Sequence, residues 1–188
     1  MSALGLLSGV MCQPKPIRLM VEYNIQESVL QSRLIPINKV NLILDRITFT
    51  MTIVFFTIFF WLPLLDLFNH PYIKIGFLLT VVILSFLLST FKWNRAMKLK
   101  IIVTPNSESD NKELIKSVIL NSGYTIVHNS IDNIQATDLL KRLELNFIIR
   151  KKEIYINTNY YFFRSIWPDS KICNKMINEI TQRIKAGT

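Results

Sequence analysis

Two long runs of apolar residues dominate the pattern of hydrophobic and polar positions along this chain. Residues 47–65 and 75–91 contain no charged side chain, and a short connection beginning at Asp66 separates them. An α-helix rises about 1.5 Å per residue, so each run is close to the roughly 20 residues that span the hydrocarbon core of a bilayer. The pattern therefore predicts a membrane hairpin of two helical spans.

Positive charge flanks the outer ends of the two runs. These ends carry Arg33, Lys39, Arg46, Lys92, Arg95, Lys98 and Lys100. The connection between the runs contributes Lys74 alone. Because cytoplasmic flanks hold the excess of Lys and Arg, this distribution predicts that both termini are cytoplasmic, with an inverted hairpin as the alternative.

Small and hydroxyl residues recur four positions apart within the spans. The pairs are Thr48 with Thr52, Gly76 with Thr80, and Ser85 with Ser89. Positions i and i+4 share one helix face, and small side chains there let two helices approach closely. We expect these pairs to pack the two spans against each other, or to join copies of the chain in a homo-oligomer. Neither span has the ionisable residue that transporters keep at bilayer depth, which argues against a transporter.

The remaining residues, 97–188, show short helical and strand-like patterns in turn. Strands are expected at 99–103, 124–128, 145–150 and 153–157, and the last two form a hairpin around Lys151 and Lys152. A first helix should begin at a capping box of Asp110 and Glu113 and end near Ser122, before Gly123. A shorter helix is expected at 137–143.

The final helix has the clearest period of this segment. It should begin at Pro168 and end before Gly187, with one apolar face of Ile172, Met176, Ile177, Ile180 and Ile184. The predicted order is βαβαββα, a small cytoplasmic α/β or α+β domain. The chain thus divides into a cytoplasmic N-terminal arm (1–36), a transmembrane hairpin (37–93) whose entry helix opens at Pro36, and the cytoplasmic domain (97–188).

The net charge narrows the choice of partners. The chain carries a formal charge of +9 and a pI near 9.7. Much of this excess positive charge flanks the spans, where it would attract anionic lipid. We therefore expect the bilayer as a partner, and nucleic acid only indirectly through another protein. Cys12 and Cys173 form no spaced motif and are expected as free thiols.

Motifs of catalysis are missing from the sequence. His70 is expected outside the membrane and His128 inside, so the two histidines cannot share a metal ion. The sequence also lacks a phosphate-binding loop, a dinucleotide fingerprint and a nucleophile elbow. We therefore expect no enzyme activity, no catalytic residue, no cofactor and no metal.

One loop could bind an anionic ligand. Four polar residues lie between the first strand and the first helix of the domain: Thr104, Asn106, Ser107 and Ser109. This is the position where α/β folds bind phosphate groups on free backbone amides. An ordinary polar loop is the alternative, because the glycines for close backbone approach are missing.

Basic and aromatic residues interleave between 150 and 167, as they do on contact surfaces for partners. The candidates for partner binding are Arg150, Lys151, Lys152, Tyr161, Arg164 and Trp167. Arg and aromatic side chains supply much of the energy of protein interfaces. Core packing of the aromatic residues, with the charges facing the membrane, is the alternative.

The layout as a whole resembles a known class of protein. A short basic arm, two charge-free spans and a small cytoplasmic domain are similar to the two-helix membrane effectors of bacterial antiphage defence, such as those paired with retrons or cyclic-oligonucleotide signalling. The resemblance implies a toxin-like protein of the bacterial inner membrane, whose cytoplasmic domain binds a regulatory partner or ligand and whose spans impair the membrane on activation. A non-catalytic membrane anchor or scaffold subunit of a larger complex is the alternative.

Overall fold

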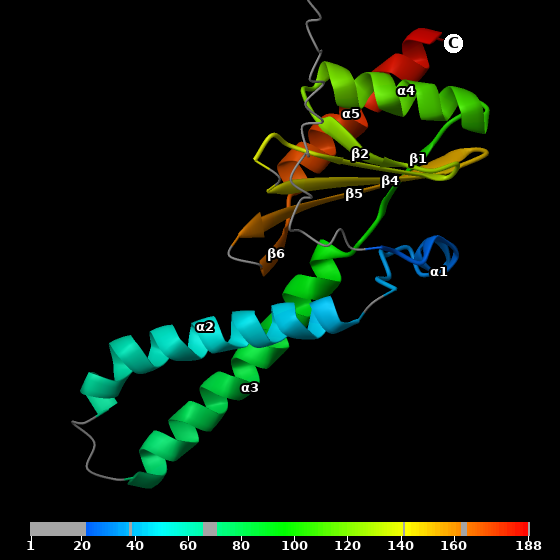
Figure 1. The fold of residues 1–188 in the computed structure, drawn as a ribbon. Coiled ribbons are helices and arrows are strands. Elements are labelled where there is room, and N and C mark those ends of the chain that lie inside the picture. Colours follow the sequence, from blue (N-terminus) through cyan, green and yellow to red (C-terminus); the bar gives the residue numbers. More distant parts are fainter. Residues whose placement is uncertain (1–21, 38, 66–70, 141, 163–164, 188) are drawn as a thin grey trace, which may run out of the picture.

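The structure, a computed structural model, describes residues 22–37, 39–65, 71–140, 142–162 and 165–187. Two long helices project from a separate sheet region, and the remaining helices pack on or near the sheet (Figure 1). The helical pair contains α2 (Val40–Leu65) and α3 (Pro71–Ala96).

Both long helices are apolar and exposed. The segments Leu42–Phe60 and Tyr72–Ala96 are long and apolar enough to cross a membrane, and only 6% and 11% of them is buried. Phenylalanines line the surface of α2, with stacked or edge-on rings between Phe55, Phe56, Phe59 and Phe60. The core helix of a soluble protein would bury such side chains, so these surfaces are suited to lipid or to another apolar partner.

The sheet is antiparallel throughout. Its strands are β1 (Lys100–Val103), β2 (Thr125–Asn129), β3 (Asn133–Thr137), β4 (Leu143–Arg150), β5 (Glu153–Phe162) and β6 (Ser165–Pro168). Strands β2 to β5 form a meander in which neighbours in sequence are neighbours in space. The long β5 is flanked on its other side by β1 at its beginning and β6 at its end.

The predicted order of elements is wrong in two places. Strand β6 was not predicted, and Pro168, expected to open the last helix, is its last residue, so that α5 begins at Ser170. The other error lies at β3, which was not predicted either. The region expected to form a helix at 137–143 contains the end of β3 and a loop instead. Asp138 Oδ1 accepts the backbone N–H groups of Arg142 and Leu143, at 2.7 and 2.9 Å, so its side chain fixes a turn. The observed order is βαβββββα. The first two strands, β1 and β2, are not neighbours, because they lie at opposite edges of the described sheet.

The first helix of the domain, α4 (Glu108–Asn121), begins three residues earlier than predicted. Ser107 is its N-cap, since its hydroxyl accepts the N–H of Asp110 at 3.2 Å and lies 2.7 Å from the Asp110 carboxylate. The N-cap is therefore Ser107, and the predicted capping box of Asp110 with Glu113 is wrong because both of these residues lie inside the helix. Gly123 follows the helix with a φ of 77°, as the sequence indicated.

Helices α4 and α5 (Ser170–Gly187) cover one face of the sheet (Figure 1). The fully buried side chains between these two helices and the sheet include Ile115, Ile119, Leu145, Phe147, Ile154, Ile156, Met176 and Ile180. The predicted apolar face of the last helix and the hairpin of β4 and β5 are both confirmed. Each followed from a strong local period.

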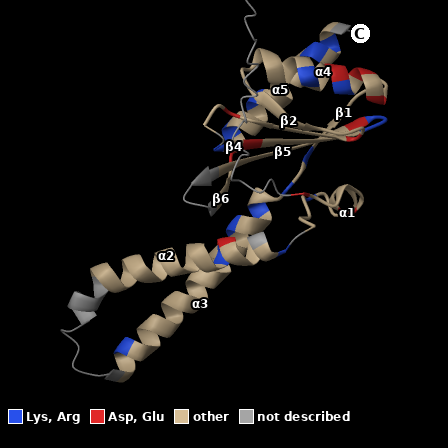
Figure 2. Cartoon of the chain, viewed as in Figure 1, with Lys and Arg blue, Asp and Glu red and all other residues tan. Residues whose placement is uncertain are grey.

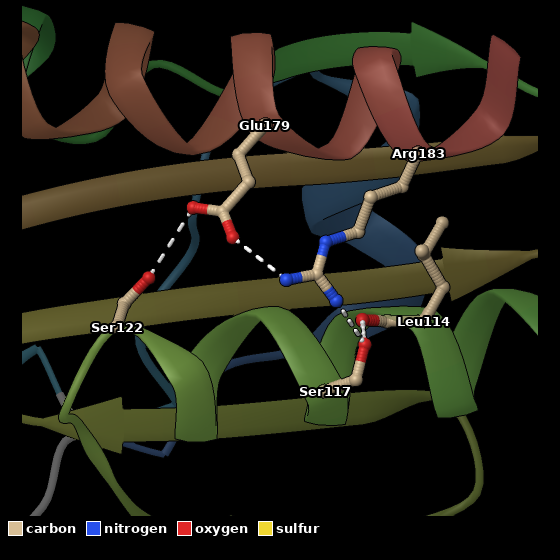
Figure 3. A network of polar contacts seen from close by, with 5 residues as sticks. All are labelled: Leu114, Ser117, Ser122, Glu179 and Arg183. Atoms are coloured by element: carbon tan, nitrogen blue, oxygen red, sulfur yellow. Dashed lines mark hydrogen bonds and ion pairs between the residues drawn. The ribbon is translucent and has the colours of Figure 1, made fainter. Parts of the chain in front are cut away.

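A polar network joins the two covering helices on their outer side (Figure 3). The guanidinium of Arg183 pairs with Glu179 at 3.0 Å and donates to the Ser117 hydroxyl at 2.8 Å. Ser122 lies 3.4 Å from the other carboxylate oxygen of Glu179. These half-exposed contacts orient α5 along α4 and add little to stability.

The described part of the N-terminal arm, residues 22–36, lies on the opposite side of the sheet from α4 and α5. It contains α1 (Ile25–Leu30), and Pro36 forms a β-bridge with Tyr23. The entry helix predicted to open at Pro36 instead begins at Val40, because Pro36 belongs to this folded arm.

Candidate functional site

A buried ion pair lies where the long helices meet the sheet. Lys92 Nζ of α3 lies 3.5 Å from Asp45 Oδ2 of α2, and the two side chains are only 6% and 3% exposed. The other Asp45 oxygen, Oδ1, accepts the backbone N–H of Ile166 in β6 at 2.9 Å. One carboxylate therefore joins α2, α3 and the sheet, and we call these contacts the junction.

Aromatic rings enclose the Lys92 ammonium group. It lies 4.1 Å from the ring centroid of Phe49 and 5.0 Å from that of Trp167, and the two rings meet edge to face at 5.7 Å. Cation–π contacts of a desolvated ammonium group are attractive. The rings also exclude water, which makes loss of either charge costly for its partner.

A second set of contacts holds the end of α3 on the sheet. The side-chain amide of Asn157 in β5 donates to the carbonyls of Ala96 and Lys98, at 2.7 and 2.9 Å. The last carbonyls of a helix have no partner within the helix, so Asn157 acts as a cap supplied by the sheet. The exit of the helix is thereby fixed in place.

The arm completes the junction from the other side. Leu34 donates its backbone N–H to Met97 at 2.7 Å, and Leu99 donates to Ser32 at 3.0 Å. These bonds pair the arm with the segment between α3 and β1. A second apolar cluster forms around them, comprising Tyr23, Leu34, Trp93, Ala96, Met97, Leu99, Ile148, Tyr155 and Ile166.

Polar side chains run across this face of the sheet. Gln135, Asn146 and Asn157 are directly opposite one another on three neighbouring strands, and each is at most 4% exposed. Asn146 donates to Glu144 at 2.9 Å, and the Tyr23 hydroxyl donates to the same carboxylate at 3.3 Å. This polar row is the face that receives the arm and the end of α3.

Charge is concentrated at the same end of the hairpin (Figure 2). Within the described parts of α2 and α3, every Asp, Glu, Lys or Arg other than Lys74 lies in the first turns of α2 or the last turns of α3. The junction therefore occupies the level where apolar helix surface gives way to polar surface.

The residues predicted to pack the spans separate into two groups. Ser85 and Ser89 are 1% and 0% exposed. They share a face of α3 with Lys92, which contacts Asp45 of α2, so this face points toward α2. Thr52 and Thr80 are exposed, and their hydroxyls donate to Thr48 and Gly76 of their own helices. The first group packs the two helices within one chain, whereas the second lies on open surface and its role in an oligomer stays a prediction.

The predicted ligand loop is held together by its own side chains. Thr104 is 2% exposed and donates to Asn111 at 3.0 Å, while the Asn106 N–H donates to Thr104. Ser107 caps α4 and Ser109 lies exposed in its first turn. These contacts match an ordinary capped loop, and binding of a ligand there stays a prediction.

The structure does not gather the predicted partner-binding residues into one surface. Arg150, Lys151 and Lys152 lie at the turn between β4 and β5, where Arg150 is 3.7 Å from Asp132. Trp167 lies in the junction, in β6 opposite Tyr160 near the other end of β5, and the seven residues of β5 that separate it from the turn extend about 23 Å. The Tyr161 side chain and Arg164 are outside what the structure describes.

Sequence reasoning missed the residues that form the junction. The charge pattern marks Lys92 only as a topology signal, and no motif points to Asp45. The signal was present, because the outer ends of an antiparallel hairpin are neighbours and Asp45 is a carboxylate at the same outer end as Lys92. Asn157 and Gln135 gave no comparable signal, since polar residues in a strand are usually exposed.

The described residues contain no group of three or more His, Cys, Asp or Glu side chains that could hold a metal ion. Burial raises the pKa of the Cys173 thiol, so this cysteine is a core residue and a poor nucleophile.

Comparison with known proteins finds no matching family model, no similar curated protein and no similar solved structure.

Proposed function

We propose that this protein is a membrane effector whose sheet domain controls a two-helix hairpin. In this proposal α2 and α3 span the bacterial inner membrane with both termini in the cytoplasm, and the domain holds them in a harmless packing. Binding of a regulatory partner or ligand to the domain changes that packing, and the spans then impair the membrane.

The junction at Asp45 is the observation that carries the proposal. Its carboxylate contacts both spans and the backbone of β6, and all of these groups are buried. Separating the domain from the hairpin would take the Ile166 N–H group away from Asp45 Oδ1 and uncover the Asp45–Lys92 pair, and a buried acceptor that loses its donor is unfavourable. A displacement of β6 would therefore move Asp45 through its bond with Ile166, and with it the packing of α2 on α3.

The exposed apolar surface of the helices supports the membrane part of the proposal. An aqueous protein rarely leaves contiguous apolar surface of this extent uncovered. The basic flanks support the cytoplasmic placement of both ends.

The test compares full-length variants in bacteria at matched membrane levels. Asp45→Ala removes both the ion pair and the acceptor for Ile166, whereas Asp45→Asn keeps an oxygen for that N–H group. We expect Asp45→Ala to depolarise cells and arrest growth, with a weaker effect of Asp45→Asn. The control is Glu113→Ala, at an exposed carboxylate of α4, which should behave as the unaltered chain. Membrane potential is read with a voltage-sensitive dye.

A non-catalytic anchor or scaffold subunit is the second candidate. It is favoured by the arm, whose hydrogen bonds to the segment after α3 stiffen the connection between hairpin and sheet. If every Asp45 variant leaves potential and growth unchanged at equal membrane levels, the effector proposal is wrong and the scaffold becomes the better account.

A further inference from the structure

A cavity of about 340 Å³ opens beside the junction. It lies between the arm, the first turns of α2 and the last turns of α3. One wall is apolar and is formed by Leu34, Leu42, Trp93 and Met97. Three of these four side chains are at most 5% exposed, so the wall is part of the packed core and is firmly held.

The charged groups of the lining are mainly cationic. Arg33, Lys39 and Arg46 line the cavity, against the single carboxylate of Glu27. Both oxygens of Glu27 already accept side-chain hydrogen bonds, from Asn24 at 3.4 Å and Gln31 at 3.0 Å. The cavity therefore has an excess of positive charge that its own carboxylate does not balance.

Arg46 supplies an independent sign of a missing ligand. Its Nε is buried and has no hydrogen-bond partner among the residues that the structure describes. A buried donor without an acceptor is unfavourable, and Arg donors bind phosphate oxygens well. Lys39, Leu42 and Arg46 follow one helical face at spacings of three and four, so both cations are presented to the same cavity.

We propose that this cavity binds the phosphate group of an anionic phospholipid. The three cations would contact the phosphate, and the apolar wall would contact the glycerol and the beginning of the acyl chains. This inference rests on the proposed membrane location, because it places the cavity at headgroup level. The candidate span of α2 begins at Leu42 and that of α3 ends at Ala96, beside the cavity.

A soluble phosphate compound offers the same anionic group. It would leave the apolar wall unused, whereas a phospholipid matches both halves of the cavity. The volume is near the lower end of the roughly 300–1,000 Å³ range of small-molecule sites, which suits a headgroup. We therefore assign the site to lipid, and the experiment separates the two sources.

The test measures binding to the purified full-length protein in a non-ionic detergent by calorimetric titration. The probes are phosphatidylglycerol, phosphatidylcholine of the same chain length, and sodium phosphate. We expect saturable binding of phosphatidylglycerol alone. Arg46→Gln and Lys39→Gln should each weaken it about tenfold, the range of a charge-assisted hydrogen bond. Arg95→Gln is the matched control, an exposed cation of α3 outside the cavity, and should leave the affinity unchanged.

Equal binding of the two phospholipids, or equal losses for Arg95→Gln and Arg46→Gln, would overturn the proposal. Binding of sodium phosphate as tight as that of phosphatidylglycerol would reassign the site to a soluble ligand. Because Lys39 is exposed at the helix start, Lys39→Gln should fold normally even if Arg46→Gln does not. The titration does not depend on toxicity. Lipid binding can therefore be absent while the Asp45 variants still depolarise cells, and it can be present while they do not.

Discussion

The two faces of the sheet are built from different chemistry. The face under α4 and α5 is apolar, with Phe147 and Ile154 fully buried. The face toward the arm and the hairpin buries amides such as Asn146 and Asn157 among apolar neighbours. Apolar packing is non-directional and stabilises the domain, whereas a buried amide tolerates only arrangements that satisfy its hydrogen bonds. The first face therefore stabilises the fold, and the second fixes how the hairpin leaves it.

Loss of apolar volume should have the largest effect. We expect Phe147→Ala to lower the free energy of unfolding of the sheet domain by about 3–5 kcal/mol, because it leaves a cavity in the fully buried core. Denaturant unfolding of the full-length protein, followed by near-UV circular dichroism, measures this. Leu139→Ala is the control, at a side chain 86% exposed, and should change stability by less than about 0.5 kcal/mol. Similar losses for both variants would contradict the assignment of the core.

A change on the polar face should be smaller and more local. Asn157→Leu keeps the size of the side chain but leaves the Ala96 and Lys98 carbonyls without their donor, which costs about 1–3 kcal/mol. We expect faster hydrogen exchange of the backbone amides at 97–99, with little change in the strands under α5. Asn129→Leu, at an exposed position of β2, serves as the control. If the amides at 97–99 are as well protected from exchange in Asn157→Leu as in Asn129→Leu, Asn157 does not hold the end of α3.

How far the sequence predicted the structure differs between the same two faces. The apolar stripe of α5 through Met176 and Ile180 and the β4–β5 turn at Lys151 were recognisable because a local period or turn signal determines them. Strand β3 was not predicted, although Ile134 and Ala136 alternate with polar residues. Gln135 is buried beside Asn146 of the neighbouring strand, and this burial depends on how the whole sheet is covered, which no local pattern contains.

The candidate site was predictable only in part. Ser85 and Ser89 were selected for helix packing and are buried, since small residues at helical spacing are a local signal. The Asp45–Lys92 pair needed the geometry of the whole hairpin, and the contact of Asp45 with Ile166 needed the position of β6. Such contacts join segments that are far apart in sequence.

The smallest expected effect on stability at neutral pH is that of replacing Tyr155, which lies on the polar face. Its hydroxyl donates to Glu153 at 2.6 Å, and this bond, with burial, raises the pKa of Tyr155 to about 12. A raised pKa means that the fold favours the neutral phenol. The resulting stability is present below the unfolded pKa of about 10 and is lost as pH rises toward 12. Tyr155→Phe should abolish this part of the alkaline loss, measured as the difference in Tm between pH 9 and pH 12. An identical alkaline loss in both proteins would contradict it.

The central claim is that the buried Asp45–Lys92 pair holds α2 on α3 where the hairpin meets the sheet, and a double-mutant cycle tests it most directly. Asp45→Asn, Lys92→Met and the double variant are compared by the free energy of unfolding of the full-length protein in detergent. Each single change should cost about 3 kcal/mol or more, because it leaves one buried charge unpaired. The double variant should then cost at least about 1 kcal/mol less than the sum of the single changes. Costs that add to within about 0.3 kcal/mol would show that the two residues act independently, and the account of the junction would be wrong.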